Sequence, residues 1–187
     1  MRGRINQNLN QYKTPKGFRG KSKLVVQLWR FIYVLFFRTS PQFMYNWRRF
    51  LLKAFGAKIG KGILIRPSVK ITYPWKVSIG DYSWIGDDVV LYSLGEIEIG
   101  KNSVISQRSY ICTGFHDYQK QDFPIYSKKI VIKSSCWIAT DVFIGPGTTI
   151  NEGVVIGSRS SVYKDLPPYT VCIGSPAKVV KERKIEE

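Results

Sequence analysis

The stretch IKSSCWIATDVFIGPGTTINEGVVIGSRSSV, from Ile132 to Val162, repeats with a period of six residues. An aliphatic residue opens every hexad: Ile132, Ile138, Ile144, Ile150, Ile156 and Val162. A period of six fits neither an α-helix, at about 3.6 residues per turn, nor a single long strand, at about 2. It is typical of short strands joined by tight turns, each of which directs one aliphatic side chain inward. The pattern therefore predicts a β-helix with three hexads in every coil.

The same spacing continues upstream and is interrupted once. Aliphatic residues six apart form three earlier triplets: Ile59, Ile65 and Ile71; Ile79, Ile85 and Leu91; Ile99, Ile105 and Ile111. These triplets begin 20 residues apart, whereas 33 residues separate Ile99 from Ile132. The 13 additional residues lie in an extruded loop, residues 113–131, and the only histidine of the chain, His116, lies near its start. We therefore expect a β-helix over residues 56–166, with this loop leaving it.

Positive charge is concentrated in the N-terminal part of the chain. The protein has 29 Lys and Arg against 13 Asp and Glu, and residues 1–80 contain 17 of the basic residues and no acidic one. Residues 81–187 contain 12 basic and 13 acidic residues, so their net charge is −1. A local positive field of this kind attracts nucleic acid, anionic lipid or an acidic substrate. Composition alone does not choose among these partners.

The three cysteines, Cys112, Cys136 and Cys172, form no CxxC pair. Their spacing suggests neither a structural zinc site nor a disulfide framework, so we predict no bound metal and a reducing compartment. Residues 1–23 are polar and basic without an apolar core, which argues against a secretory signal. They are expected to be ordered only where they dock on other parts of the molecule.

Residues 1–55 form a basic, aromatic segment with two expected helices. The apolar run Leu24–Phe37 contains 14 residues, fewer than the roughly 20 that a membrane-spanning helix needs. Ser40 and Pro41 have the features of a cap and first turn for a second helix, which ends before Gly56. The two helices can cap the open end of the β-helix, and they can also lie in a membrane interface. Nucleic-acid binding is the third alternative, but no nucleic-acid module is visible.

Residues 167–187 are expected to form a tail outside the β-helix. Pro167 and Pro168 should end the strand ladder, because proline cannot donate a backbone hydrogen bond to it. The charged residues Lys178–Glu187 favour a short terminal helix over the last coil.

Four motifs beyond the periodicity point to a known family. TGFHDY at residues 113–118 and WIATDVFIGPGTTINEGVVIGSRSSVYKDLPPYTVCIGSPAKVVK at residues 137–181 resemble the hexapeptide-repeat acyltransferases that use acetyl-CoA. Upstream, WRRFLLKAFGAKIGKG and YPWKVSIGDYSWIGDDVVLYSLG resemble the colanic acid biosynthesis acetyltransferases and related exopolysaccharide O-acetyltransferases of that superfamily. The resemblance implies a mainly β protein, a left-handed parallel β-helix with an N-terminal α-helical hairpin and a short C-terminal helix. It also implies a homotrimer with three active sites between neighbouring subunits.

The resemblance assigns the central catalytic role to His116. Acetyl transfer from a thioester to a sugar hydroxyl needs a base that takes the hydroxyl proton, and imidazole is largely neutral at about pH 7. The family's loop histidine acts as this base, and His116 matches it within TGFHDY. Asp117 can orient the imidazole ring or simply fix the loop. Transfer is expected to be direct, without an acyl-enzyme, with Cys112 as a small core residue.

The family binds the pantetheine arm of acetyl-CoA along a groove between adjacent β-helices. The positions of this chain that match its binding residues are Trp137, Ala139, Thr140, Ser158, Lys164, Lys178 and Lys181. Ala139 stands where glycine is more usual and still leaves room for the arm. Each of the three lysines offers a point cation to the phosphates of CoA, although a solvated basic tail explains Lys181 equally well.

The acceptor is expected near Asp87, Asp88 and Ser93, since carboxylates commonly bind sugar hydroxyls, although surface turns explain these residues as well. We predict an acetyl-CoA-dependent O-acetyltransferase that acts on a sugar of an exopolysaccharide or surface glycan. Its acceptor would be nucleotide- or lipid-linked, at the cytoplasmic face of the membrane, with peripheral contact to anionic lipid. The alternatives are N-acetylation of an amino sugar or small acceptor, and a non-catalytic β-helix scaffold.

Overall fold

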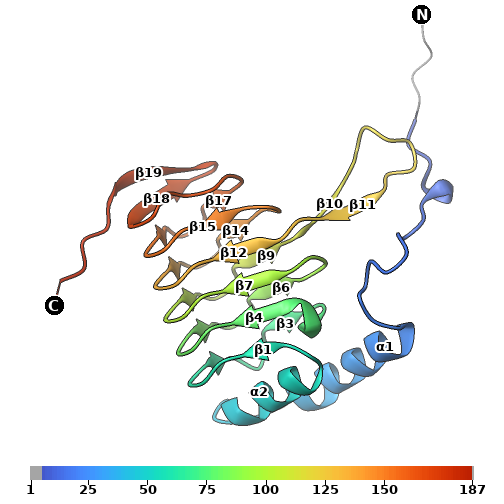
Figure 1. The fold of residues 1–187 in the computed structure, drawn as a ribbon, viewed down its shortest axis with the longest axis horizontal. Helices are drawn as coiled ribbons and strands as arrows, with labels where there is room; N and C mark the ends of the chain where they lie inside the picture. The colour runs from blue at the N-terminus through green and yellow to red at the C-terminus, as the bar shows by residue number, and fades with distance from the viewer. Residues whose placement is uncertain (1–5, 187) are drawn as a thin grey trace, which may run out of the picture.

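The structure, a computed structural model, describes residues 6–186. The first five residues of the predicted N-terminal segment and the last residue of the predicted tail lie outside the described residues. Short strands follow one another in coils that stack from bottom to top in Figure 1, with two helices beneath the first coil. The predicted β-helix is therefore confirmed, and the aliphatic residue of each hexad lies in a strand.

The coils form three sheets, which we name A, B and C, and their strands are parallel except for the last strand of sheet B. Sheet A contains β1 (Lys58–Ile59), β4 (Val77–Ile79), β7 (Ile97–Ile99), β12 (Ile130–Ile132) and β15 (Thr149–Ile150). Sheet B contains β2 (Leu64–Ile65), β5 (Trp84–Ile85), β8 (Val104–Ile105), β13 (Trp137–Ile138), β16 (Val155–Ile156), β18 (Thr170–Gly174) and β19 (Ala177–Glu182). Sheet C contains β3 (Lys70–Ile71), β6 (Val90–Tyr92), β9 (Tyr110–Cys112), β14 (Phe143–Ile144) and β17 (Ser161–Val162).

The strand register places the aliphatic residues of successive coils directly above one another. In sheet B, Ile138 pairs with Ile105 below it and with Ile156 above it, and none of the three side chains is exposed. Burial of an isoleucine side chain stabilises the folded state by about 1.5–3 kcal/mol. Because backbone hydrogen bonds between coils satisfy the polar groups, the hexads build the core without further partners.

The strand ladder continues past Pro167 and Pro168, contrary to the prediction. Leu166 lies over Ile150, and β18 pairs in parallel with β16 so that Cys172 lies over Ile156. The two prolines occupy the turn between these positions, where no ladder hydrogen bond is required of them. They mark a corner of a further coil and not its end.

The predicted C-terminal helix is wrong, because residues 177–182 form β19. This strand pairs antiparallel with β18, with Lys178 opposite Ile173 and Lys181 opposite Val171. The free edge of β18 offers backbone hydrogen-bonding groups to the chain that follows it. Val179 and Val180 also favour a strand, since β-branched side chains pack well on a pleated surface.

The first predicted helix is present over its whole length. α1 (Lys23–Ile32) continues into a wider π-helical turn, η2 (Tyr33–Phe37). Ser22 caps α1, because its hydroxyl oxygen accepts a hydrogen bond from the Val25 backbone N–H at 3.4 Å. Two short 3₁₀ turns lie elsewhere in the described chain, at Leu9–Gln11 (η1) and Pro74–Lys76 (η3).

The second helix, α2 (Tyr45–Ala54), begins four residues later than predicted. Ser40 does not cap it, because the Ser40 hydroxyl donates to the Phe37 carbonyl and accepts from the Arg48 guanidinium. The predicted end is confirmed: Gly56 has a φ of +88°, and the N–H of the next residue donates to the Leu52 carbonyl. Such a left-handed glycine closes a helix C-terminus at little steric cost.

Both helices are fixed to the first coil by buried side chains. The Trp29 indole N–H donates to the Ile71 carbonyl at 2.9 Å, and Arg48 Nε donates to the Ile65 carbonyl at 2.7 Å. Arg48 is completely buried, and this burial lowers the pKa of its guanidinium. The helices therefore cover the open end of the β-helix, which is the first of the roles considered for them.

The described part of the N-terminal segment docks on the coils and on the extruded loop. The Trp75 indole N–H donates to the Arg19 carbonyl at 2.7 Å, and the Lys76 ammonium donates to the Phe18 carbonyl at 2.6 Å. Further along, the Asn8 backbone N–H donates to the Gln121 carbonyl at 2.8 Å. Residues 6–22 thus connect the helical end of the molecule to the loop that contains the histidine.

Candidate active site

The predicted extruded loop contains a β-hairpin, and the hairpin positions His116. β10 (Gly114–His116) and β11 (Ile125–Ser127) pair antiparallel, with the rings of Phe115 and Tyr126 opposite each other at 5.6 Å. A Cβ atom at Gly114 would lie 2.7 Å from the end of the Leu94 side chain and 3.2 Å from the Tyr92 ring, so the hairpin leaves the coil through a crowded position. In Figure 1 the hairpin projects to the right of the stacked coils.

Two contacts with Phe123 fix the imidazole ring of His116. Its Nδ1 lies 2.9 Å from the Phe123 carbonyl oxygen, and the two rings stack with centroids 4.2 Å apart and planes 10° apart. Because a carbonyl oxygen has no proton to give, Nδ1 is the donor in this hydrogen bond. In the neutral ring the other nitrogen, Nε2, then has the lone pair. The hairpin therefore presents an oriented acceptor for a proton.

Asp117 fixes the hairpin and does not orient the imidazole. Its carboxylate accepts a hydrogen bond from the Gln119 backbone N–H at 3.1 Å and lies 3.7 Å from the Lys120 ammonium. In the described chain, the ring-orienting hydrogen bond of His116 goes instead to Phe123. Of the two roles considered for Asp117, the geometry favours the loop-fixing one.

A residue that the sequence analysis missed lies beside the histidine. Tyr12, from the N-terminal segment, has its ring centroid 6.3 Å from that of His116. The two residues are 104 positions apart in the chain, so no local motif could have paired them. Only the docking of the N-terminal segment along the coils brings the phenol to the hairpin.

Five of the predicted acetyl-CoA residues lie on or beside one sheet. On sheet B the register places Trp137, Val155, Val171 and Lys181 in a single row. The Trp137 ring is 48% exposed, and its indole N–H donates to the Ser106 hydroxyl at 3.1 Å, which fixes the orientation of the ring. Three further positions stand close to this row in the same sheet or at its turns: Ala139, Thr140 and Lys178. An exposed, fixed indole followed by lysines is suited to a long ligand with an anionic end.

The remaining two predicted acetyl-CoA residues lie at different places. Ser158 is exposed at a turn between sheets B and C, where the next residue, Arg159, donates its N–H to the Thr140 carbonyl. Lys164 is exposed after β17, at the end of sheet C. The structure therefore brings Ser158 next to Thr140, whereas Lys164 belongs to another corner of the same chain.

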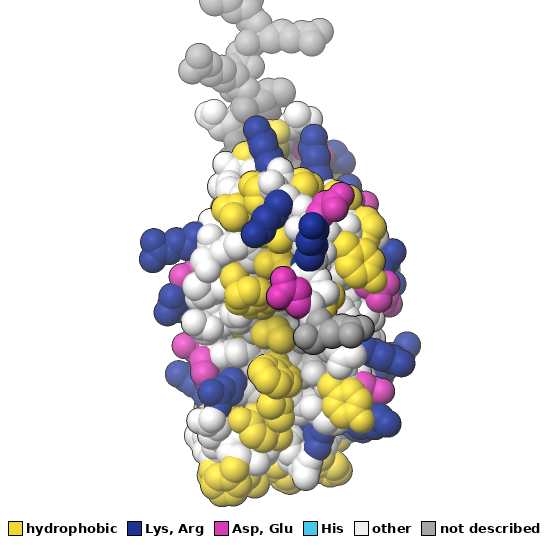
Figure 2. Space-filling model, turned by 90° about the vertical axis from the view of Figure 1, so that its left-hand side faces the viewer, with side chains coloured by type: hydrophobic (Ala, Val, Ile, Leu, Met, Phe, Trp, Pro, Cys, Tyr) yellow, Lys and Arg dark blue, Asp and Glu magenta, His cyan; other side chains and the backbone are white. Residues whose placement is uncertain are grey.

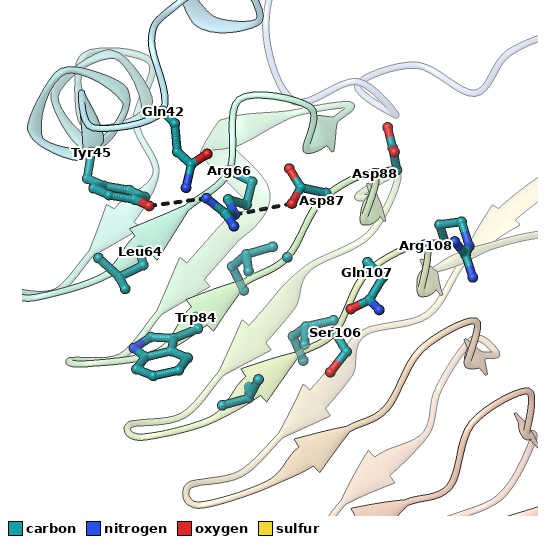
Figure 3. A pocket seen from close by; sticks show the side chains of 14 residues that line it. Gln42, Tyr45, Leu64, Arg66, Trp84, Asp87, Asp88, Ser106, Gln107 and Arg108 are labelled. Atoms are coloured by element: carbon teal, nitrogen blue, oxygen red, sulfur yellow. Dashed lines mark hydrogen bonds and ion pairs between the residues drawn. The ribbon is translucent and has the colours of Figure 1, made fainter.

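A cleft of about 610 Å³ lies between α2 and the first coils of sheet B. Figure 3 shows Gln42 and Tyr45 of the helical segment beside Arg66, with Asp87 beyond it and the Asp88 side chain pointing away from them. Further lining residues come from sheet B and its turns: Leu64, Trp84, Ser106, Gln107 and Arg108. The Trp84 ring is 54% exposed. Aromatic faces together with carboxylates and amides match the apolar faces and hydroxyl groups of a sugar ring.

Ion pairs fix most of the charged groups around the cleft. Arg66 Nε lies 3.2 Å from an Asp87 oxygen, and the other Asp87 oxygen accepts from the Ser68 hydroxyl at 3.1 Å. Arg108 makes two hydrogen bonds to Asp141, at 2.7 and 2.8 Å, and these bonds hold the pKa of the Asp141 carboxyl below its usual value. Asp87 is therefore held in place by its partners, while Asp88 is exposed at the next position.

The backbone at Asp88 follows the general geometry of the coil corners. Asp88, Arg108, Asp141 and Arg159 all have φ between +56° and +59°, at equivalent turns between sheets B and C. Non-glycine residues with positive φ occur at the other corners as well, for example at Asn102. The conformation is thus a property of the fold, and it gives no separate indication of function at Asp88.

Ser93 does not belong to the cleft, so this part of the acceptor prediction is wrong. Its side chain is completely buried. The Ser93 hydroxyl accepts from the Tyr73 N–H at 2.8 Å and donates to the Tyr73 carbonyl at 3.1 Å. Both hydrogen bonds serve the connection between two coils, and neither is available to a ligand.

The cysteines are thiols without a metal or disulfide partner in the described chain. Burial raises the pKa of Cys112, whose S–H donates to the Gly114 carbonyl at 3.4 Å, and burial raises the pKa of Cys136 to about 11. All three cysteines are free. Within residues 6–186 no group of three His, Cys, Asp or Glu side chains could hold a metal ion. A protonated, half-buried Cys112 is a poor nucleophile, since the thiolate is the reactive form.

The histidine and the cleft lie apart within one chain. The hollow beside His116, of about 480 Å³, and the cleft beside α2 share no lining residue. The sequence analysis found Asp87 and Asp88 but missed Arg66, Gln42 and Tyr45. Arg66 directly follows Ile65, the repeated aliphatic residue of β2, so the six-residue repeat could have placed Arg66 at a corner of the coil. Gln42 and Tyr45 reach the cleft only through the packing of the helices.

Comparisons with known proteins agree with the sequence analysis. No protein-family model matches the chain. The chain is 59% identical over 177 residues to a putative colanic acid biosynthesis acetyltransferase, WcaF, of Escherichia coli, covering 95% of this chain and 97% of the relative. It is 31% identical over 138 residues to the galactoside O-acetyltransferase of the same organism, covering 72% of this chain and 68% of that protein.

A solved structure shows the same architecture. A hexapeptide-repeat-containing acetyltransferase from Vibrio cholerae superimposes with a TM-score of 0.79 at 25% sequence identity, covering 87% of this chain and 93% of that chain. A structure of that protein complexed with acetyl coenzyme A superimposes with a TM-score of 0.78.

Proposed function

The chain belongs to the hexapeptide-repeat acetyltransferases, in the family of the colanic acid biosynthesis acetyltransferase WcaF, and we propose that it transfers an acetyl group from acetyl-CoA to a sugar hydroxyl. The acceptor would be an exopolysaccharide or surface-glycan intermediate, linked to a nucleotide or a lipid at the cytoplasmic face of the membrane. One observation carries the proposal: the His116 imidazole is fixed through Nδ1, which leaves Nε2 to receive a proton.

His116 would act as the general base. As the sugar oxygen attacks the thioester carbonyl, Nε2 takes the hydroxyl proton, the carbon–sulfur bond breaks, and the proton leaves with the CoA thiol. Stacking on Phe123 and the hydrogen bond to its carbonyl hold the ring for this step. A positioned base of this kind contributes about 10²- to 10⁴-fold to the rate. The raised pKa of the half-buried Cys112 thiol supports direct transfer without an acyl-enzyme.

The outward face of sheet B would bind acetyl-CoA. The exposed indole of Trp137 offers a flat apolar surface to the pantetheine arm, and buried Ala139 adds no bulk there. Lys178 and Lys181 on β19 lie at the far end of the same sheet, where point cations suit phosphates. Thr140 and Ser158 line the neighbouring turns, and Lys164 would reach the ligand from sheet C or from a second subunit.

The acceptor would bind in the cleft, and the active site would form between subunits. Asp87 and Asp88 would accept hydrogen bonds from sugar hydroxyls, with Trp84 under the ring. Because this cleft and the His116 hollow share no lining residue in one chain, we propose that a neighbouring copy brings His116 to them in a homotrimer. Light scattering should report about three times the 21.5 kDa of one chain.

A thiol-release assay with acetyl-CoA tests the reaction. Hydroxyl acceptors, both nucleotide-linked and lipid-linked, are compared with matched amino sugars. Thiol release with hydroxyl acceptors, and an ester product in mass spectra, would support O-acetylation. Amide product alone would establish the N-acetyltransferase alternative, and no thiol release with any acceptor would favour the scaffold.

Mixed trimers test whether the sites are shared. His116→Ala subunits are refolded with subunits that carry Lys178→Glu and Lys181→Glu, and activity is measured at limiting acetyl-CoA. If each site takes His116 from one subunit and sheet B from its neighbour, random mixing restores about a quarter of the sites. Pure trimers of either variant are the controls. No recovery would mean that each chain holds a complete site.

A further inference from the structure

The helix α1 has two apolar faces, and capping the β-helix explains only one of them. Val26 and Trp29 point inward and are 2% exposed each. Leu24, Leu28 and Phe31 recur at helical spacing on the opposite side and are 82%, 52% and 56% exposed. Helices that only cover a core place polar residues on the outer side. The outer side of α1 therefore has a second partner or faces an apolar medium.

The same exposed surface continues over η2 and α2. The Trp47 indole N–H donates to the Phe36 carbonyl at 2.9 Å and its ring stacks on Phe50 at 5.8 Å, which joins the two helices. Figure 2 shows hydrophobic side chains gathered at the lower end of the molecule, where Figure 1 places these helices. We name the exposed side chains of this end the outer apolar face: Leu24, Leu28, Phe31, Val34, Leu35, Phe36, Phe43 and Phe50.

The charged side chains of the segment that forms the outer apolar face are all basic. No acidic residue precedes Asp81 in the sequence. Exposed or half-buried basic residues alternate with those of the face along residues 23–53: Lys23, Arg30, Arg38, Arg49 and Lys53. Apolar contact combined with a one-signed basic border is the composition of helices that lie in the surface of an anionic membrane. A protein partner of mixed charge would not require the complete exclusion of acidic side chains.

We propose that the outer apolar face docks peripherally on an anionic lipid bilayer. Leu24, Leu28 and Phe31 would enter the boundary between headgroups and acyl chains, and the basic border would contact lipid phosphates. No helix within residues 6–186 is long and apolar enough to cross a membrane. The face lies below the first coil at one end of the solenoid (Figure 1), so lateral contacts between parallel β-helices leave it uncovered.

Docking would place the acceptor cleft beside the membrane. Segment 42–50 contributes Gln42 and Tyr45 to the cleft and Phe43 and Phe50 to the outer apolar face. Arg48 fixes this segment from within, since its guanidinium donates to the carbonyls of Pro41 and Gln42 at 2.9 and 2.5 Å. A sugar attached to a lipid in the bilayer would then lie within reach of the cleft.

Co-sedimentation with vesicles tests the proposal on the full chain. Wild-type protein is mixed with phosphatidylcholine vesicles with and without phosphatidylglycerol, at low and high salt. The disrupting variant is Leu28→Glu with Phe31→Glu. The matched control is Val180→Glu with Ile185→Glu, which alters residues that are 56% and 64% exposed at the other end of the chain.

We expect wild type and control to bind the anionic vesicles, more weakly at high salt because the attraction is partly electrostatic. Leu28→Glu/Phe31→Glu should lower the partition coefficient by at least about tenfold, since two apolar side chains lose their burial. Leu28→Glu/Phe31→Glu should release thiol from acetyl-CoA at the wild-type rate when the acceptor is soluble. This result separates the test of membrane docking from the test of the proposed function. Binding that is equal in both variants would overturn the proposal. A wild-type mass twice that of Leu28→Glu/Phe31→Glu would assign the face to a second copy instead.

Discussion

The coils and the helical end of this protein differ in how they bury apolar side chains. In the coils, ladder residues such as Ile105 and Ile138 are fully buried. At the helical end, Leu24 of α1 and Phe43 in the turn before α2 are 82% and 80% exposed. A ladder residue has neighbours above and below it in the stack, whereas a helix at the end of a solenoid contacts the core on one side only.

This difference changes what an exposed apolar residue means. In the coils, the exposed indoles of Trp84 and Trp137 interrupt a regular pattern and mark the proposed ligand surfaces. At the helical end, exposed apolar side chains form one continuous surface, which suits contact with a lipid bilayer, as proposed, better than binding of a small ligand. If both proposals hold, variants of His116 and variants of the outer apolar face should affect catalysis and attachment independently.

His116→Ala should separate the two regions most clearly. Loss of the base is expected to lower kcat by about 10²- to 10⁴-fold, with acetyl-CoA affinity and vesicle binding near wild type. Thiol release and co-sedimentation measure the two properties. Gln121→Ala, at an exposed position of the same loop that does not line the hollow beside His116, is the control and should keep its activity. Near-normal turnover of His116→Ala would exclude His116 as the base.

Truncation of a ladder residue should cost far more stability than truncation of an exposed aliphatic one. Ile138→Ala is expected to reduce the free energy of unfolding by about 2–5 kcal/mol, because it leaves a cavity between two coils. Leu28→Ala, on the outer apolar face, should change it by no more than about 0.5 kcal/mol. Urea denaturation followed by circular dichroism measures both. Similar losses for the two variants would contradict the one-sided packing of α1.

Arg48 is the polar anchor between the two regions. Arg48→Met should destabilise the fold by about 2–4 kcal/mol, because the carbonyls of Ile65, Pro41 and Gln42 lose a buried charged donor. The same variant should raise KM for the acceptor, since segment 41–45 lines the cleft. Arg108→Met, which removes an exposed ion pair with Asp141, should leave stability close to wild type. Unchanged stability of Arg48→Met would show that the helices are held by their apolar contacts alone.

The smallest expected effect is a loss of coil stability at alkaline pH. The pKa of Cys136 is raised from 9.0 to about 11 by burial, so the unfolded chain loses this proton first. Stability should therefore fall as pH rises above about 9, by about 1 kcal/mol between pH 8 and pH 10 from this group. Urea denaturation at the two pH values, compared with Cys136→Val, isolates the contribution. An equal decline in Cys136→Val would assign the effect to other groups.

The sequence predicted the coils well because each ladder position depends on a local period. Ile132 to Val162 occupy the predicted stack, and Gly56 closes α2 where expected. The errors arose where a segment had a choice of tertiary partner. Residues 177–182 became a strand because the edge of β18 was open. Ser93 was buried because Tyr73 of the coil below offered both of its backbone groups.

By itself, the sequence determined the β-helix, the place of the extruded loop and the identity of its histidine, because a six-residue period and a single histidine are properties of the chain alone. Tertiary structure decided which groups meet. The stacking of His116 on Phe123, the approach of Tyr12, and the cleft between α2 and sheet B join residues that no local pattern links. It also decided which face of α1 is buried, since both faces are apolar and only the packing of Trp29 on the first coil distinguishes them.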